Sequence, residues 1–199
     1  MNYEITEHRF RFAAWCAATA ASASPNCRFA VKVGVKLLEN AGAKKLAEGW
    51  NRLPQSVDFD AFHKETCEIL IKAAHAMPVG SFKGRGGSGN FTYGVAAKML
   101  NCFLKPLYVT GVEESISDEN LKKRNAIHPP IDRLLLQQLV NKNVNKKKKV
   151  WRSSMGRGWS NFTYDEYMTV IAEIREAIVQ EPIWKIEYYW IGFQGGAEK

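Results

Sequence analysis

Apolar residues recur every three to four positions through most of the chain, whereas strict alternation of apolar and polar residues is scarce. The first pattern is typical of amphipathic helices and the second of strands. The sequence therefore predicts a mainly α fold. The segments expected to be helical are 5–24, 27–41, 58–77, 93–105, 129–141 and 163–180, with a short turn of helix at 118–123.

Breakers and caps mark the ends of several of these helices. Pro78 and Pro106 stand where an apolar pattern stops, which fits the inability of proline to continue a helix. Thr163 and Glu166 have the spacing of a capping box. The start of the helix at 163 is therefore the most sharply defined boundary in the sequence.

The chain is long enough to bury one hydrophobic core. Its 199 residues (22.5 kDa) are 46% hydrophobic, which predicts a compact single domain and a monomer. Phe10, Phe12 and Trp15 are expected to anchor the first helix to that core. A helical part at 1–78 would precede a part at 79–199 that carries the functional residues.

The net charge of +8 and the pI near 9.3 favour a polyanionic partner, with nucleic acid before an anionic membrane surface. The chain has no run of 18 apolar residues, and its N-terminus lacks the pattern of a secretory signal. We therefore expect no membrane insertion and a cytoplasmic, nucleoid-associated protein.

The cysteines do not have the spacing of a metal site. Cys16, Cys27, Cys67 and Cys102 include no CxxC pair, and the histidines supply no HExxH motif. We expect reduced thiols, no metal site and no cofactor.

Two charged residues stand in distinctive local sequence. Lys98 lies within GVAAKMLNCFL (94–104), and Asp132 lies within HPPIDRLLLQQL (128–139). A deprotonated lysine amine can attack a sugar C1′, and a carboxylate can stabilise the positive charge that develops there. The alternatives are a solvated lysine on a helix surface and a carboxylate favoured by the dipole at a helix start.

These two segments resemble the core signature of helix-hairpin-helix DNA glycosylases, nearest to the compact archaeal-type 8-oxoguanine glycosylases. The resemblance covers roughly 45 residues and leaves 107–126 unmatched. It implies a DNA-glycosylase-like helical fold, Lys98 as the nucleophile and Asp132 as the essential carboxylate, with no cofactor. The usual Leu-Pro-Gly-Val-Gly hairpin is replaced here by GNFTYG (89–94).

Two Gly-Arg-Gly loops resemble one another, and each runs into the sequence Phe-Thr-Tyr at an expected helix start. An arginine, exposed backbone N–H groups and a helix dipole together suit a phosphate, although such loops also serve simply as caps. The residues expected to bind phosphate are Arg85, Gly86, Arg157 and Gly158.

The densest positive charge is the run Lys146, Lys147, Lys148 and Lys149. Charge runs usually form solvated faces, but this one lies beside the second glycine-rich loop and could follow a phosphate backbone. We include it in the expected DNA-binding surface.

A base-excising enzyme needs a pocket that receives a flipped base. The ring-bearing residues nearest in sequence to Lys98 and Asp132 are the candidates for that pocket. They are Phe91, Tyr93, His128 and Trp159.

The sequence thus predicts a DNA glycosylase and AP lyase that acts on a flipped base in a duplex, with an oxidised purine implied by the resemblance alone. The first alternative is a non-catalytic nucleic-acid-binding or interaction module, in genome maintenance or phage defence. The second is a small helical protein that binds another partner and whose basicity is incidental.

Overall fold

The computed structural model describes residues 3–85, 87–111 and 115–191. Its α-helices are α1 (Ile5–Ala21), α2 (Val31–Asn40), α3 (Phe59–His75), α4 (Tyr93–Leu104), α5 (Asp118–Ala126), α6 (Arg133–Asn141), α7 (Lys148–Arg157) and α8 (Tyr164–Ala177). Shorter helical turns are η1 (Ala43–Glu48), η2 (Trp50–Arg52), η3 (Ser56–Asp58), η4 (Lys105–Val109), η5 (Val144–Lys146), η6 (Trp159–Asn161) and η7 (Ile183–Tyr189). The predicted mainly α fold is confirmed.

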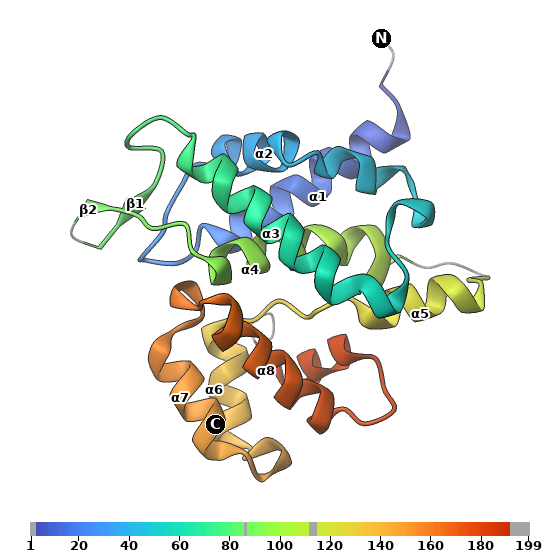
Figure 1. The fold of residues 1–199 in the computed structure, drawn as a ribbon, viewed down its shortest axis with the longest axis vertical. Helices are drawn as coiled ribbons and strands as arrows, with labels where there is room; N and C mark the ends of the chain where they lie inside the picture. The colour runs from blue at the N-terminus through green and yellow to red at the C-terminus, as the bar shows by residue number, and fades with distance from the viewer. Residues whose placement is uncertain (1–2, 86, 112–114, 192–199) are drawn as a thin grey trace.

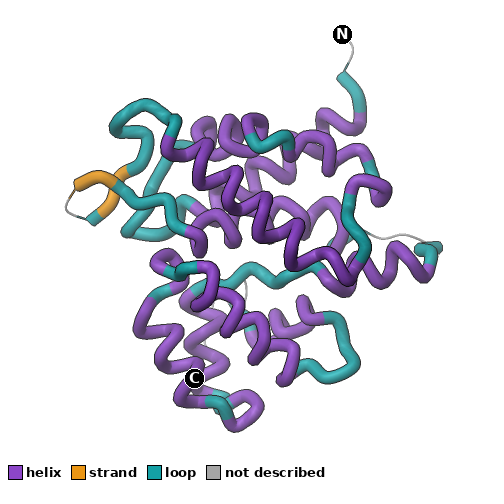
Figure 2. The backbone as a smooth tube through the Cα atoms, in the orientation of Figure 1, coloured by secondary structure: helices purple, strands orange, loops and turns teal. Residues whose placement is uncertain are grey.

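The helices form two groups joined by the extended segment 127–132 (Figure 1). The first group holds α1 to α4, with α5 at its edge, and the second holds α6, α7, α8 and η7. In the described part of the chain the strands are β1 (Lys83–Gly84) and β2 (Gly87–Ser88), which form a small antiparallel hairpin at the end of the first group (Figure 2).

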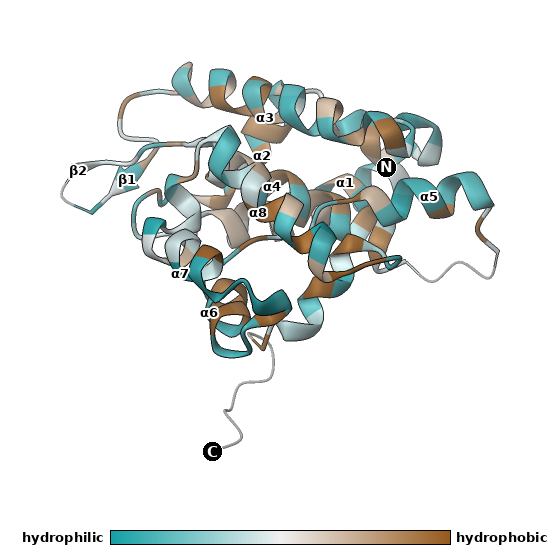
Figure 3. Cartoon of the chain, turned by 60° about the horizontal axis from the view of Figure 1, so that its bottom comes forward, coloured by the Kyte–Doolittle hydropathy of each residue, from teal (hydrophilic) through white to brown (hydrophobic). Residues whose placement is uncertain are grey.

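Helix α4 is the centre of the molecule. It packs against α1 and α3 within the first group, and it also contacts η6 and α8 of the second. Every residue of α4 except Cys102 is buried. By contrast, α5 is mostly hydrophilic (Figure 3), and its one buried residue is Lys123. A charged side chain on α4 is therefore enclosed on most sides.

Local capping explains where the central helices begin. The Thr92 hydroxyl caps α4 by accepting a hydrogen bond from the Val95 N–H (3.3 Å). Thr163 and Glu166 form the predicted capping box at the start of α8. The prediction from that spacing is confirmed.

The helix expected from 129 begins four residues later. The segment through Pro129 and Pro130 is extended, and Asp132 is the N-cap of α6 and not a member of its first turn. Asp132 has extended backbone angles (φ −140°, ψ 177°) that let its side chain fold back over the helix start. This correction matters because an N-cap side chain is held more tightly than one on a helix surface.

Two further expectations are wrong. Helix α7 begins within the lysine run, where no helix was expected; it packs against α6, and its Trp151 is fully buried. In α1, Phe10 is buried, but Phe12 and Trp15 are both about half exposed (54% and 53%). The buried face of α1 is made of alanines instead, which allow α4 to approach closely.

Candidate active site

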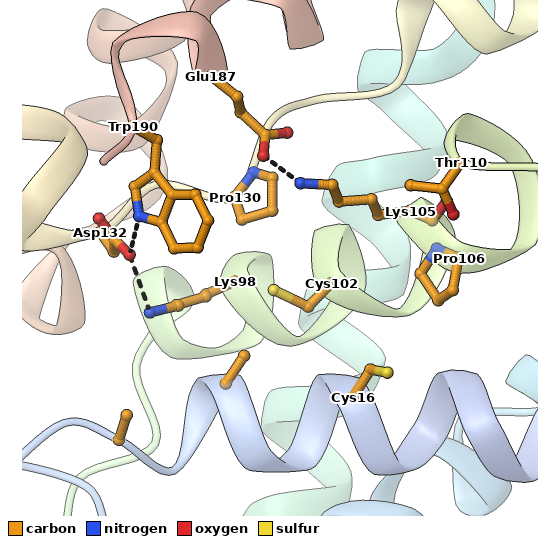
Figure 4. A pocket seen from close by; sticks show the side chains of 12 residues that line it. Cys16, Lys98, Cys102, Lys105, Pro106, Thr110, Pro130, Asp132, Glu187 and Trp190 are labelled. Carbon is orange, nitrogen blue, oxygen red and sulfur yellow. Dashed lines mark hydrogen bonds and ion pairs between the residues drawn. The ribbon is translucent and has the colours of Figure 1, made fainter. Parts of the chain in front are cut away.

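Lys98 and Asp132 meet in the structure. Lys98 projects from the second turn of α4, and its Nζ lies 3.9 Å from the nearer carboxylate oxygen, Oδ2, of Asp132 (Figure 4). Only 8% of Lys98 is exposed, so it is not the solvated surface lysine considered as an alternative. A buried ammonium group is costly unless an opposite charge or an aromatic face lies close by.

Lys98 also contacts the face of an indole ring. Its Nζ lies 4.2 Å from the centroid of the Trp159 ring, which is the geometry of a cation–π contact. Trp159 can come this close because Gly94 faces it: a Cβ atom on Gly94 would lie 1.9 Å from the Trp159 carbonyl oxygen. The lysine is therefore bounded by the carboxylate on one side and the indole on another.

The two segments with the repeated Gly-Arg-Gly and Phe-Thr-Tyr sequence build this contact together. The Gly94 N–H donates to the Phe162 carbonyl (3.1 Å), and the Thr92 hydroxyl donates to the Ser160 carbonyl (2.8 Å). The repeats thus lie side by side. Each provides a threonine that caps a helix, which was the alternative to phosphate binding for these loops. Their pairing also fixes Trp159 over Lys98.

Both oxygens of the Asp132 carboxylate are held. Oδ1 accepts a hydrogen bond from the Leu135 N–H (2.8 Å), and Oδ2 accepts one from the indole N–H of Trp190 (3.0 Å). The oxygen that faces Lys98 is thus the one bound to Trp190. Such bonds restrict the rotation of the carboxylate and fix its distance from the lysine.

These residues line a cavity of about 420 Å³, which we call the lysine pocket. It lies between the two groups of helices, with α1 and α4 on one side and the start of α6 and η7 on the other. Its lining residues are Cys16, Ala20, Ala23, Lys98, Cys102, Lys105, Pro106, Thr110, Pro130, Asp132, Glu187 and Trp190.

A second pair of opposite charges lies further along the same pocket. Lys105 and Glu187 form a close ion pair (Figure 4). Burial raises the pKa of the Glu187 carboxyl above its ordinary value, and the nearby Lys105 ammonium opposes that shift. Burial also raises the pKa of the Cys102 thiol to about 12, so this thiol is neutral near neutral pH. The pocket therefore presents hydrogen-bond donors and acceptors among largely apolar walls.

Three residues beyond Lys98 on α4, Asn101 belongs to a closed polar network, which we call the histidine cluster: His63, Asn101, His128, Tyr167, Asp60 and Arg175. Burial lowers the pKa of both histidines. The hydrogen bond from His128, with help from Arg175, holds the pKa of Asp60 well below its ordinary value. The cluster lines none of the pockets described here.

The histidine cluster fixes the segment that leads to Asp132. The Asn101 side-chain amide donates to the Pro129 carbonyl (3.0 Å) and to the Tyr167 hydroxyl (2.9 Å). His128, one residue before Pro129, is bonded to Tyr167 and Asp60. Since Asn101 lies three residues after Lys98 on the same helix, the network ties the two sides of the lysine pocket together.

Three residues expected in a base pocket lie elsewhere. His128 (1% exposed) belongs to the histidine cluster, and Tyr93 bonds to His63 at its edge. Phe91 packs against Phe29 in the core. These three residues therefore do not line the lysine pocket, contrary to the expectation from their proximity in sequence to Lys98 and Asp132. They pack around the site instead. Trp159 contacts Lys98, but it lines a separate cavity and not the lysine pocket.

The residues expected to bind phosphate fall in two places. Arg85, Arg157 and Gly158 line a second cavity, whereas the lysine run lies at the far end of α6 and α7 from Asp132. Within that run Lys147 is paired with Glu173 and Glu176. Gly86 lies outside the described residues.

Several lining residues of the lysine pocket had no signal in the sequence. Glu187 and Trp190 come from an aromatic segment more than fifty residues after Asp132, and Lys105 lies just after the segment 94–104. The spacing of Lys98, Cys102 and Lys105 along one helical face was the only local indication that they share a surface.

Over residues 3–85, 87–111 and 115–191, no group of three or more His, Cys, Asp or Glu side chains is placed to hold a metal ion. No helix in this part of the chain has both the length and the apolar character needed to cross a membrane. Comparison of the chain with models of protein families, with curated proteins and with solved structures found no match. Functional inference therefore depends on the site itself.

Proposed function

We propose that this protein is a DNA glycosylase with AP lyase activity. The observation that carries the proposal is the juxtaposition of a buried lysine and a fixed carboxylate, 3.9 Å apart, at the wall of a cavity. The cavity volume of about 420 Å³ is in the range of small-ligand sites, and its walls are mostly apolar. A flipped base requires an enclosed pocket of this kind, with apolar walls and a few polar groups.

In the proposed reaction the Lys98 ammonium first gives up a proton to water, and the free amine then attacks the sugar C1′ atom. The bond from C1′ to the base nitrogen breaks, and the base leaves with the electron pair of that bond and takes up a proton. Asp132 stabilises the positive charge that develops on the sugar. Ring opening then gives a protonated Schiff base between Lys98 and C1′.

The Schiff base also accounts for strand cleavage. It acidifies the C2′ proton, and loss of that proton expels the 3′ phosphate by β-elimination. Water finally hydrolyses the Schiff base and frees the amine. All groups needed for these steps are those of the protein, the DNA and water.

Lys105 and Glu187 would recognise the base by hydrogen bonds to its edge. One offers donors and the other acceptors, on the wall of the same cavity as Lys98. Purines carry both kinds of group at their edges. An oxidised purine, implied by the sequence resemblance, is the substrate to test first.

The test is borohydride trapping of the protein on duplexes that contain 8-oxoguanine or an abasic site. Borohydride reduces a Schiff base to a stable amine, so wild type is expected to form a covalent adduct and Lys98→Gln none. Lys72→Gln, at an exposed position on α3, is the matched control and is expected to behave as wild type.

Two results would overturn the proposal. An adduct that persists in Lys98→Gln would mean that another amine reacts. No adduct from folded wild-type protein on either duplex would argue against the lysine mechanism on these lesions, and salt-sensitive binding in the same samples would then favour the non-catalytic nucleic-acid-binding module.

A further inference from the structure

A second cavity has Trp159 among its lining residues. Its volume is about 500 Å³, and three arginines line it: Arg85 from the β-hairpin, Arg133 from the start of α6, and Arg157 from the end of α7. We call it the arginine pocket. The Gly-Arg-Gly sequences predicted phosphate binding by Arg85 and Arg157, whereas nothing in the sequence pointed to Arg133.

The arginine pocket has an uncompensated positive charge. None of its lining residues is an aspartate or a glutamate. Arg157 is paired with Glu166 (2.9 Å), which is not among the lining residues. Among the described residues, no hydrogen bond or ion pair engages the side chain of either Arg85 or Arg133, and both are exposed. Two guanidinium groups are thus available to an anion.

The rest of the lining is polar and able to make hydrogen bonds. Ser24, Asn26 and Asn161 contribute hydroxyl and amide groups, and Asn26 donates to Asn161 across the pocket wall (3.4 Å). A guanidinium group can donate two parallel hydrogen bonds to the oxygens of one phosphate, and it stays charged at all physiological pH values. This composition fits a phosphodiester better than an apolar or cationic ligand.

The arginine pocket adjoins the lysine pocket through two shared elements. Trp159 lines the arginine pocket, and the centroid of its ring lies 4.2 Å from Lys98 Nζ. Asp132 and Arg133 are consecutive residues, and the first lines the lysine pocket while the second lines the arginine pocket. A chain of nucleotides could therefore place a base in the lysine pocket and a neighbouring phosphate in the arginine pocket.

We propose that the arginine pocket binds the DNA backbone at a phosphate next to the nucleotide whose base enters the lysine pocket. This inference rests on the proposed function for its choice of nucleotide, but its anion-binding role stands on the pocket alone. Phosphate contacts fix the register of a protein on DNA and carry no sequence information. The pocket would thus position C1′ for Lys98 without selecting the base.

The test measures binding of a duplex that contains a stable abasic-site analogue, over a range of salt concentrations. Arg85→Gln and Arg133→Gln are each expected to weaken binding roughly tenfold at low salt. Each should also reduce the slope of log Kd against log salt by about 0.9, the loss of one phosphate contact. Arg152→Gln, on exposed α7 surface outside the pocket, has the same charge change and is expected to leave both quantities near wild type.

Two outcomes would overturn the arginine pocket as a phosphate site. Equal weakening by all three substitutions would show a diffuse basic surface, and no weakening by Arg85→Gln or Arg133→Gln would show that the pocket lies outside the contact. Borohydride trapping separates this inference from the proposed enzyme. If wild type forms no adduct but the two pocket variants lose binding, the phosphate site stands and the enzymatic proposal fails. If wild type is trapped and the pocket variants bind as wild type does, the enzymatic proposal stands and the phosphate site fails.

Discussion

Two polar residues of α4, Asn101 and Lys98, lie three positions apart in contrasting settings. Asn101 belongs to the histidine cluster, whose members are mostly buried and hydrogen-bonded to one another. Lys98 contacts one carboxylate oxygen and an aromatic ring at the wall of an open cavity. A polar network that satisfies its own hydrogen bonds contributes to stability, whereas polar groups at the wall of a cavity remain available to a ligand. We therefore expect substitutions in the histidine cluster to affect stability most and substitutions at Lys98 to affect the proposed reaction most.

The largest expected effect comes from opening the closed network. Asn101→Leu keeps the number and branching of the side-chain heavy atoms but removes one hydrogen-bond partner each from His63, the Pro129 carbonyl and Tyr167. Tyr167 keeps its bond to His128, whereas His63 Nε2 and the Pro129 carbonyl lose their closest partners. Each buried group left without a partner costs about 1–3 kcal/mol, so we expect a loss of about 2 kcal/mol or more in the free energy of unfolding. Urea denaturation measures it. Gln137→Leu, at an exposed position of α6, is the control and should change stability little.

Acid should act on the histidine cluster by a different route. Burial lowers the pKa of His63 and His128 from the ordinary 6.5, so both are neutral in the folded protein near neutral pH. The unfolded chain takes up protons as the pH falls through about 6.5, and the folded chain does so only at lower pH. Stability is therefore present above this range and lost below it, by up to about 1.4 kcal/mol per pH unit for each histidine.

Urea denaturation between about pH 7 and about pH 5 measures this slope. The exposed His75 provides the control, because His75→Gln should leave the slope unchanged. A second decline should begin below about pH 4, where Asp60, whose pKa is lowered in the fold, becomes protonated in the unfolded chain. Stability that stays constant from neutral pH to about pH 5 would contradict the first prediction.

The smallest effect on stability is expected at the lysine pocket. Asp132→Ala removes the N-cap of α6 and should cost about 1 kcal/mol, whereas Asp132→Asn keeps a good capping residue and should cost less. Both remove the negative charge beside Lys98, so both should reduce the rate of borohydride trapping by at least about a hundredfold. If Asp132→Asn kept the wild-type trapping rate, the carboxylate would be a cap and nothing more.

Local signals made much of the fold predictable. The Thr163 and Glu166 spacing gave the start of α8 correctly, and the apolar run after Thr92 gave α4. Helix α7 was missed because its sequence begins with lysines and buries a single large residue, Trp151. Its stability comes from packing against α6, which no local pattern reveals.

The candidate site was predictable only in its centre. Lys98 and Asp132 stand in distinctive local sequence, and the structure brings them together. Glu187 and Trp190 reach the same cavity through tertiary folding, so nothing in their own neighbourhood marked them. Nothing in the sequence identified Asn101 as buried, because sequence period alone cannot distinguish a polar face exposed to water from one satisfied by buried partners.

Gly94 has a consequence for how this chain can vary. Glycine inside a helix lowers its stability by about 1 kcal/mol relative to alanine, so replacement by alanine would ordinarily be an improvement. Here any side chain would collide with the Trp159 carbonyl, at 1.9 Å from the new Cβ atom. In a library in which every residue type is sampled at this position, folding and trapping activity should together retain glycine alone. The separation of the two helical groups, and with it the width of the cavity between them, is thus set by the absence of a single carbon atom.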